Sequence, residues 1–280
     1  MVQKIRSKTK LVGIIGYPLG HTLSPVLHNS LFSELNLDMV YLAFEVIPKR
    51  VKNVCESFRT LNVVGANVTI PYKEKIISQL DKVDVLAKEI GAVNTVVNKN
   101  DLLVGYNTDV FGFVKSLSDK EKFLSGKKVF MVGCGGVSKA IVCGLRKMRV
   151  KSIFVYDIDK KKMFGLTKKY KGFVVAVSEK DFKKVFSEVS MFVNATSVGM
   201  RDGDKIVVPA ELLKKDVLVY DVIYNRETEL LREARKVGCE TLSGLDMFVY
   251  QAAESFRLWT GVEPPLDYMF SVVKSQLKIK

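Results

Sequence analysis

Apolar runs of strand length alternate with longer segments of helical period along most of the chain. Residues 10–16, KLVGIIG, are typical of a strand, and 24–35 carry apolar side chains at helical spacing, with Pro25 at the first helical position. Ser24 is placed to act as the N-cap of that helix. A turn signal, NKND at 98–101, separates two further apolar runs and predicts a β-hairpin.

The alternation defines the fold class. Further strands are predicted at 39–46, 63–70, 127–133, 152–157, 173–177, 190–196 and 217–224, and further helices at 48–61, 74–91, 112–119, 135–148, 160–170 and 181–186. Strands that alternate with helices predict parallel sheets with helices on their faces, the α/β class. Two such series in 280 residues predict two α/β domains.

Two helices end the chain without a strand after them. Residues 246–261 and 266–277 both carry apolar side chains at helical spacing, and the first covers a broad apolar surface. They either extend the second domain or return to pack on the first.

The net charge of +14 raises the question of an anionic partner. The lysines are spread along the whole chain, often beside acids, and do not alternate with aromatics as in a single-strand binder, so we expect no nucleic-acid partner. No apolar run approaches the length that crosses a bilayer, so we expect no membrane partner. The apolar run after the basic N-terminus is too short for a signal peptide, which predicts a cytoplasmic protein.

The cysteines and histidines do not indicate a metal centre. No cysteine pair has CxxC spacing, so free, mostly buried thiols are expected. His21 and His28 have no cysteine or further histidine near them in the sequence, which makes a structural zinc site improbable. The cysteines are Cys55, Cys134, Cys143 and Cys239.

The clearest local motif is VFMVGCGGVSKAIV, where a strand runs through Gly133, Gly135 and Gly136 into a helix. Small residues there let the backbone approach a pyrophosphate, and the helix N-terminus supplies N–H donors. Asp157 ends the next strand 21 residues after Gly136, where an acid binds the adenosine ribose and favours NAD. The alternative is a generic α/β turn, because Ser138 replaces the third glycine.

Polar clusters upstream suggest a second site. GANVTIPYK, GAVNT and GYNTD each place polar residues at the end of an apolar run, and ligands bind beyond the carboxyl ends of strands in open α/β sheets. Lys73 beside Asp109 could orient a substrate hydroxyl and relay its proton. Thr22 and Ser24 in GHTLSP offer hydroxyls, although Ser24 is equally a plain cap. Capping and loop hydrogen bonds are the alternative for each residue taken singly. The residues expected to converge are Asn67, Thr69, Lys73, Asn94 and Asp109.

With these clusters in order, the chain resembles the shikimate dehydrogenase family, including its quinate/shikimate branch. The resemblance spans nearly the whole chain and rests on GYPLGHTLSPVLHN, GANVTIPYKE, GAVNT, GYNTD, GCGG, NATSVGM, DVIYNRETELL and MFVYQAAESFRLWTG. It implies an α/β substrate domain, 1–109 with 245–280, and a Rossmann-type doubly wound NAD(P)-binding domain, 110–244. The C-terminal helices would return to the first domain.

The resemblance also implies an activity, reversible reduction of 3-dehydroshikimate to shikimate by NAD or NADP in aromatic amino acid biosynthesis, and site residues. Lys73 and Asp109 match the catalytic pair, and no metal is implied. Substrate positions are Thr22, where the family usually has serine, Ser24, Asn67, Thr69, Asn94, Tyr224 and Gln251. Cofactor positions are Gly133, Gly135, Gly136, Val137, Asp157, Asn194, Ala195, Thr196, Ile223 and Gly244. A cleft between two domains also predicts closure on binding.

One departure from the family pattern concerns the cofactor. NADP-using members usually have Asn-Arg-Thr where this chain has Asp157-Ile158-Asp159. Two acids there disfavour a 2′-phosphate by about 1 kcal/mol or more, so NAD is favoured, although three lysines at 160–162 could partly compensate.

Alternative functions remain at this point. The nearest is an NAD-dependent enzyme that acts mainly on quinate, and a remoter one is a non-catalytic nucleotide-binding protein, which retention of Lys73 and Asp109 argues against. The expected assembly is a monomer or a homodimer.

Overall fold

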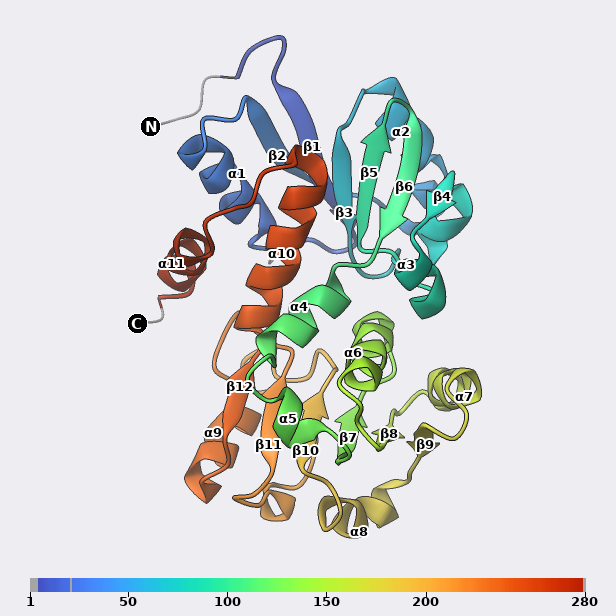
Figure 1. The fold of residues 1–280 in the computed structure, drawn as a ribbon, viewed down its shortest axis with the longest axis vertical. Helices are drawn as coiled ribbons and strands as arrows, with labels where there is room; N and C mark the ends of the chain where they lie inside the picture. The colour runs from blue at the N-terminus through green and yellow to red at the C-terminus, as the bar shows by residue number, and fades with distance from the viewer. Residues whose placement is uncertain (1–4, 21, 279–280) are drawn as a thin grey trace. The chain divides into compact units, whose positions relative to one another are not determined.

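The computed structural model describes residues 5–20 and 22–278, which form two compact units (Figure 1). Unit 1 consists of the described residues up to Gly112 and from Val249 onward, and unit 2 is Phe113–Phe248. The chain passes between the units within two helices, α4 (Asp109–Ser116) and α10 (Leu245–Thr260). The C-terminal helices therefore return to the first unit, which decides between the two alternatives left open by the sequence.

Unit 1 contains a six-stranded mixed sheet in the order β2-β1-β3-β5-β6-β4. The expected hairpin is confirmed: β5 and β6 are antiparallel and are joined through Asn100 and Asp101, with φ of 53° and 68°. The sheet of unit 1 is therefore mixed, because a two-residue connection can only join antiparallel strands. The strands are β1 (Lys10–Gly16), β2 (Met39–Glu45), β3 (Gly65–Val68), β4 (Lys82–Val83), β5 (Thr95–Lys99) and β6 (Leu102–Tyr106).

The helices of unit 1 follow the predicted segments with local differences. Helix α1 begins at Ser24, so Leu23 is the N-cap and the expectation that Ser24 caps the helix is wrong. Segment 48–61 divides into a 3₁₀ helix, Pro48–Asn53, and α2 (Val54–Thr60). Segment 74–91 also divides into a 3₁₀ helix and an α-helix, with β4 between them, and the sequence pattern did not predict β4. The remaining helices are a 3₁₀ helix (Lys75–Gln79), α3 (Val85–Ile90) and α11 (Leu266–Leu277).

Aromatic side chains fill the core between α1, β2 and α10. The ring of His28 stacks on Tyr41 with centroids 4.6 Å apart and meets Trp259 edge-on at 5.3 Å. Trp259 donates its indole N–H to the Val96 carbonyl at 3.0 Å. Gly65 permits this approach, because a Cβ there would lie 2.3 Å from the indole nitrogen.

Unit 2 contains a six-stranded sheet that is parallel throughout, in the order β12-β11-β10-β7-β8-β9. Numbered from β7, this is the order 3-2-1-4-5-6 of the doubly wound dinucleotide-binding fold. The crevice of such a sheet lies where the order reverses, here between β7 and β10. The strands are β7 (Lys128–Val132), β8 (Ser152–Tyr156), β9 (Val174–Ala176), β10 (Met191–Asn194), β11 (Leu218–Asp221) and β12 (Thr241–Ser243).

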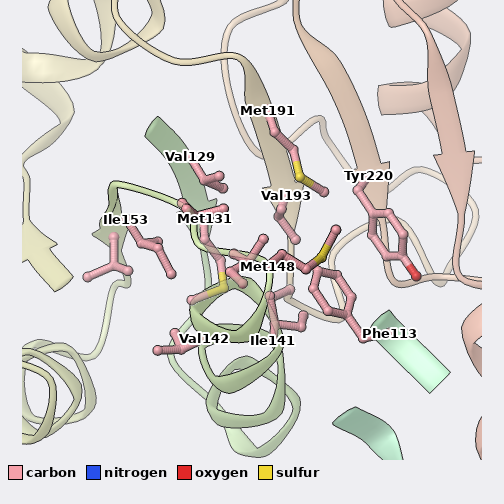
Figure 2. Close-up of a cluster of buried hydrophobic side chains, with 14 of the residues drawn as sticks. Phe113, Val129, Met131, Ile141, Val142, Met148, Ile153, Met191, Val193 and Tyr220 are labelled. Atoms are coloured by element: carbon pink, nitrogen blue, oxygen red, sulfur yellow. The ribbon is translucent and has the colours of Figure 1, made fainter. Parts of the chain in front are cut away.

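Successive side chains of β7 point alternately into the two hydrophobic cores that lie on opposite faces of this sheet. Val129 and Met131 point into one core, with Ile141 of helix α6 (Gly136–Lys147), as Figure 2 shows. Phe130 and Val132 belong to the core on the other face. The other helices of the unit are α5 (Glu121–Leu124), α7 (Lys160–Lys169), α8 (Phe182–Phe186), α9 (Glu229–Val237) and two 3₁₀ helices (Glu179–Asp181 and Ala210–Leu212). The sequence pattern did not predict α9 or β12.

Two expectations from composition can be compared with the structure. The four cysteines are free and buried, as predicted. Within residues 5–20 and 22–278, no helix is long and apolar enough to cross a membrane. His21, one of the two histidines considered for a metal site, lies outside the described residues.

Candidate active site

The side chains of Lys73 and Asp109 form an ion pair in unit 1. Nζ of Lys73 lies 2.7 Å from Oδ2 of Asp109, and the two side chains are 15% and 8% exposed. Lys73 stands in the turn after β3, where its carbonyl accepts the backbone N–H of Val93. Asp109 is the first residue of α4, where the helix dipole favours a carboxylate. The pair presents a mostly buried donor and acceptor.

Asn94 holds the second oxygen of the Asp109 carboxylate. Its Nδ2 donates to Oδ1 of Asp109 over 2.8 Å. The amide orientation is fixed, because its Oδ1 accepts the backbone N–H of Thr108 at 2.7 Å and a backbone N–H can only donate. Asn94 precedes β5, so the expectation that it ends a strand is wrong. The antiparallel pairing of β5 brings its start beside the ends of β3 and β6.

Asn67 extends the same network within the sheet. Its Oδ1 accepts the hydroxyl of Tyr41 at 2.7 Å, and its Nδ2 donates to the Asn94 carbonyl at 3.2 Å. Nδ2 also lies 3.3 Å from Oγ1 of Thr95 and 3.1 Å from Oγ of Ser255. The Asn67 amide is therefore almost fully engaged with protein groups, which fits a side chain only 7% exposed.

Three further predicted substrate residues come from the segments that follow β1 and β3. The hydroxyls of Thr22 and Ser24 are 3.3 Å apart, and Ser24 is buried. Thr69 follows β3 and packs closely on Gly16, where a Cβ would lie 2.4 Å from its methyl carbon. Among the hydrogen bonds described for residues 5–20 and 22–278, none joins Thr22 or Ser24 to the network around Asn94.

The last two substrate candidates belong to different units. Gln251 lies on α10 within unit 1, and its Oε1 is 3.5 Å from Nδ2 of Asn94. Tyr224 lies in unit 2, where its ring stacks on Phe248 with centroids 4.3 Å apart. The structure thus joins Gln251 to the network of unit 1, and Tyr224 belongs to unit 2.

Unit 1 therefore offers a defined chemistry. A lysine ammonium can donate a proton to a substrate oxygen, and a carboxylate whose two oxygens are held can orient both the lysine and a substrate hydroxyl. The amides of Asn67, Asn94 and Gln251 supply further donors and acceptors nearby. This is the equipment for proton transfer at a polyhydroxylated ligand.

The glycine turn of unit 2 has the geometry of a phosphate-binding loop. Gly133 adopts φ of 104°, and a Cβ there would lie 2.7 Å from the Ala195 carbonyl oxygen. Among the residues that the structure describes, a Cβ at Gly135 would meet nothing within 4 Å, and no side chain caps the helix that begins at Gly136. Open space in front of uncapped N–H groups fits the pyrophosphate of a dinucleotide. Val137, in the first turn of that helix, packs partly on the core.

Cys134, inside this turn, is a packing residue. Its side chain is 3% exposed, and burial together with the nearby Asp157 raises the pKa of its thiol to about 12. The reactive thiolate is therefore suppressed at neutral pH.

Asp157 connects the glycine turn to the end of β8. Its Oδ2 accepts the backbone N–H of Cys134 at 2.6 Å, and its Oδ1 accepts that of Asp159 at 2.7 Å. Asp159 is the N-cap of α7 and accepts the N–H groups of Lys161 and Lys162, and the latter bond is the main cause of its lowered pKa. Ile158 between them is 90% exposed.

Asn194 and its neighbours form a second connected group in unit 2. The Asn194 carbonyl oxygen Oδ1 accepts the backbone N–H and the hydroxyl of Thr196, which orders the loop that begins at Ala195. Its Nδ2 donates to Oδ1 of Asp221 at 3.0 Å. The same Asp221 oxygen accepts the N–H of Ile223, whose carbonyl in turn accepts the N–H of Gly244.

These cofactor candidates lie at or just after the carboxyl ends of parallel strands, the edge at which such sheets bind nucleotides, and Asn194 is the last residue of β10. Gly133, Asp157, Ala195, Ile223 and Gly244 come after β7, β8, β10, β11 and β12 respectively. The residues present therefore fit a dinucleotide.

Sequence reasoning missed Asp221, a buried carboxylate at the end of β11. Burial raises its pKa to about 6, while the hydroxyl of Thr228, the N–H of Ile223 and the Asn194 amide act in the opposite direction. Tyr41, Thr95, Thr108 and Ser255 were also missed. Thr95 and Thr108 stand inside the polar motifs GAVNT and GYNTD, which was the available signal, whereas Tyr41 and Ser255 lie in apolar segments.

The fold and the two groups of residues define a two-unit α/β protein with a dinucleotide-binding unit, and the comparisons identify it as an NAD(P)-dependent oxidoreductase. Residues 14–96 match the shikimate dehydrogenase substrate binding domain, and 244–274 match the shikimate 5′-dehydrogenase C-terminal domain. A protein of Aquifex aeolicus named shikimate dehydrogenase (NADP+) is 42% identical over 93% of this chain and 95% of its own. The chain belongs to the shikimate dehydrogenase family.

Solved structures agree with this assignment. The crystal structure of shikimate dehydrogenase from Aquifex aeolicus has a TM-score of 0.90 at 40% identity and covers 98% of this chain and 100% of that one. The structure of shikimate 5-dehydrogenase from Listeria monocytogenes, in complex with shikimate and NAD, has a TM-score of 0.87 at 36% identity and covers 98% of this chain and 99% of that one. The structure of quinate dehydrogenase from Corynebacterium glutamicum, in complex with NAD, has a TM-score of 0.88 at 33% identity and covers 95% of this chain and 99% of that one.

Proposed function

We propose that this protein is a shikimate dehydrogenase, which reversibly reduces 3-dehydroshikimate to shikimate with a nicotinamide cofactor. The observation that carries the proposal is the Lys73–Asp109 pair at 2.7 Å, held by Asn94, in a chain that belongs to this family. In this proposal residues 1–109 and 245–280 bind the substrate and residues 110–244 bind the cofactor.

The roles of the residues in unit 1 follow from their contacts. Lys73 donates a proton to the substrate oxygen during reduction and takes it back during oxidation. Asp109 holds Lys73 through one oxygen and faces the Asn94 amide with the other, which restricts the directions open to the proton. Thr22, Ser24, Asn67, Thr69 and Gln251 would bind the hydroxyl and carboxylate groups of the substrate. Tyr224 is proposed as a further substrate residue by its match to the family pattern.

The residues of unit 2 would hold the cofactor, which supplies the hydride when bound. The N-terminus of α6 at Gly135, Gly136 and Val137 would receive the pyrophosphate. Gly133 leaves room for the loop of Asn194, Ala195 and Thr196 at the sheet crevice. Ile223 and Gly244, joined by a backbone hydrogen bond, would line the nicotinamide end.

We propose NAD as the preferred cofactor. Both oxygens of Asp157 are fixed by backbone N–H groups, so the carboxylate is held where a ribose hydroxyl could bind it. A second carboxylate, Asp159, stands two residues further on, and a 2′-phosphate near both acids would lose about 1 kcal/mol or more. Lys162 lies 3.6 Å from Asp159, so part of its charge is already paired. The Aquifex relative is named for NADP, whereas two of the similar structures hold NAD.

A second candidate function is oxidation of quinate. It is favoured by the likeness to the quinate dehydrogenase of Corynebacterium glutamicum, whose complex contains NAD, the cofactor proposed here. Quinate has one more hydroxyl than shikimate and a saturated carbon beside its carboxylate. We propose that the hydroxyls of Thr22 and Ser24 discriminate between quinate and shikimate.

One experiment tests all three parts of the proposal. Initial rates are measured with shikimate and with quinate, each with NAD and with NADP. We expect the highest kcat/KM for shikimate with NAD. Oxidation of neither substrate in any combination would overturn the enzymatic assignment, and a tenfold preference for NADP would overturn the cofactor assignment alone.

A further inference from the structure

The hydroxyl of Ser255 stands at the centre of the polar network in unit 1. Ser255 lies on α10, is fully buried, and comes from a helix whose surroundings are largely apolar and aromatic. Its Oγ donates to the carbonyl of Gln251 at 3.0 Å, the usual bond of a helical serine. Three further polar atoms lie within hydrogen-bond distance of it: Oγ1 of Thr95 at 2.8 Å, Oγ1 of Thr108 at 3.1 Å and Nδ2 of Asn67 at 3.1 Å.

The donors of Asn67 show why this hydroxyl is needed. Nδ2 of Asn67 has two hydrogens, and the carbonyl of Asn94 takes one of them. The second hydrogen can be donated to Oγ of Ser255, 3.1 Å from Nδ2, or to Oγ1 of Thr95, 3.3 Å away. The distance to Ser255 is the shorter of the two. Tyr41 donates to Oδ1 of the same amide, so Ser255 and Tyr41 hold its two ends.

Two further hydroxyls, those of Thr95 and Thr108, lie between Ser255 and the Asn94 amide beside the proposed catalytic pair. Oγ1 of Thr95, in contact with Ser255, lies 3.0 Å from Oδ1 of Asn94, and Oγ1 of Thr108 accepts from Nδ2 of Asn94 at 2.9 Å. The other hydrogen of that Nδ2 goes to Asp109. The Thr108 N–H fixes the orientation of the Asn94 amide, and the hydroxyls of Thr95 and Thr108, both in contact with Ser255, pack around that amide.

We infer that Ser255 is a positioning residue, whose buried hydroxyl holds the Asn67 amide and the hydroxyls of Thr95 and Thr108 around Asn94, the residue that holds Asp109 of the Lys73–Asp109 pair. This inference rests on the proposed function. A buried serine with only a packing role is satisfied by one hydrogen bond to a carbonyl of its own helix. The three additional partners of Ser255 instead all belong to the polar network that contains Asn67 and Asn94. Removal of the hydroxyl leaves buried polar atoms of Asn67, Thr95 and Thr108 to rearrange.

The test is the variant Ser255→Ala, with Ser116→Ala as the matched control. Ser116 is also a buried helical serine, bonded to its own-helix carbonyl of Phe113 at 2.8 Å and to the hydroxyl of Tyr220 at 2.9 Å, but it lies in unit 2. Both variants are expected to unfold at lower temperature. Because small displacements of catalytic groups are costly, only Ser255→Ala should lower kcat/KM for shikimate, by about tenfold, while the Kd of the cofactor stays unchanged.

Two further measurements keep the result interpretable. Thr95→Val combined with Ser255→Ala should lose less than the product of the two single effects, because both act on the same amides. If Ser255→Ala does not fold, Ser255→Cys, which retains a weak donor of similar size, should give an intermediate loss. A kcat/KM within twofold of wild type in the folded variants would overturn the inference. Absence of turnover in the wild-type enzyme would instead overturn the proposed function, and the inference with it.

Discussion

Lys73 and Asp109 meet at 2.7 Å although 36 residues separate them in the chain. Lys73 comes from the turn after β3 and Asp109 from the first turn of α4, and the β5–β6 hairpin lies between them in the sequence. Asn94 and Thr108, which flank that hairpin, bond to each other, and Asn94 holds the carboxylate. The hairpin is thus the element that brings donor and acceptor together.

The first prediction concerns the role of Lys73. Lys73→Ala should lower kcat by at least about a hundredfold, because a positioned proton donor contributes about 10²–10⁴-fold. The Kd of the cofactor, measured by fluorescence of the reduced form, should change little because Lys73 lies in unit 1. Lys75→Ala, an exposed lysine two residues away, is the control and should retain wild-type rates. Weakened cofactor binding in Lys73→Ala would place the lysine at the wrong site.

The second prediction concerns cofactor choice at Ile158. Ile158→Arg should lower the KM for NADP by about tenfold, since a guanidinium pairs with phosphate, while the 90% exposed position accepts the change without loss of stability. This single change leaves Asp157 in contact with the glycine turn, which an Asp157→Asn change would disturb by setting an NH₂ group against an N–H donor. Ile158→Gln, polar but uncharged, should leave the KM for NADP unchanged. Equal effects of Arg and Gln would show that charge at this position is not the determinant.

The third prediction is a loss of stability in acid caused by His28. Burial lowers the pKa of His28 to about 3, and neither ring nitrogen has a hydrogen-bond partner among the described residues. Below pH 6.5 the His28 ring is protonated in the unfolded chain, whereas in the folded protein it stays neutral down to about pH 3. The free energy of unfolding should therefore fall by about 1.4 kcal/mol per pH unit as the pH drops from 6.5 toward 3.

His28→Phe isolates this effect, because it keeps an aromatic ring and removes the titrating group. Denaturant unfolding can be followed through Trp259, the chain's single tryptophan, whose ring lies 5.3 Å from that of His28. The stability difference between variant and wild type should widen by about 2 to 3 kcal/mol between pH 6.5 and 4.5. A difference that is independent of pH would contradict the assignment.

The fourth prediction has the opposite sign and concerns Asp221. Burial raises its pKa from 3.8 to about 6, so the ionised form is disfavoured in the folded protein. Stability contributed by this group should fall as the pH rises from 3.8 to 6, by about 3 kcal/mol in total, and stay constant above. Asp221→Asn lacks this titration, so its stability relative to wild type should improve over the same interval.

Hydrogen exchange over residues 217–239 would measure the effect of Asp221→Asn within unit 2. We expect the protection of the variant, relative to wild type, to rise between pH 4 and pH 7 after correction for the intrinsic exchange rate. Leu231→Ala, a buried apolar change on the neighbouring α9, serves as a control that should lower protection equally at both pH values. Parallel behaviour of the two variants would refute a role for the Asp221 charge.

Much of the secondary structure could be predicted because its causes are local. The alternation of Val129, Phe130, Met131 and Val132 marks a strand buried on both faces, and the apolar spacing of α6 marks a helix on one of them. The NKND turn predicted its hairpin for the same reason. Strand β4, with two residues, and β12, with three half-buried residues, are too short to show a period.

The sequence by itself determined the elements, the glycine turn with its following acid, and the identity of most polar residues in the site. Tertiary structure alone decided that β5 pairs antiparallel with β3, which places Asn94, at the start of β5, beside the end of β3. It also decided that Ser255 meets Asn67 across 188 residues of chain, and that Asp157 binds the N–H of Cys134. The physical reason is that periodicity and turn chemistry act over a few neighbouring residues. The partners of a buried polar atom are chosen only when distant segments pack together.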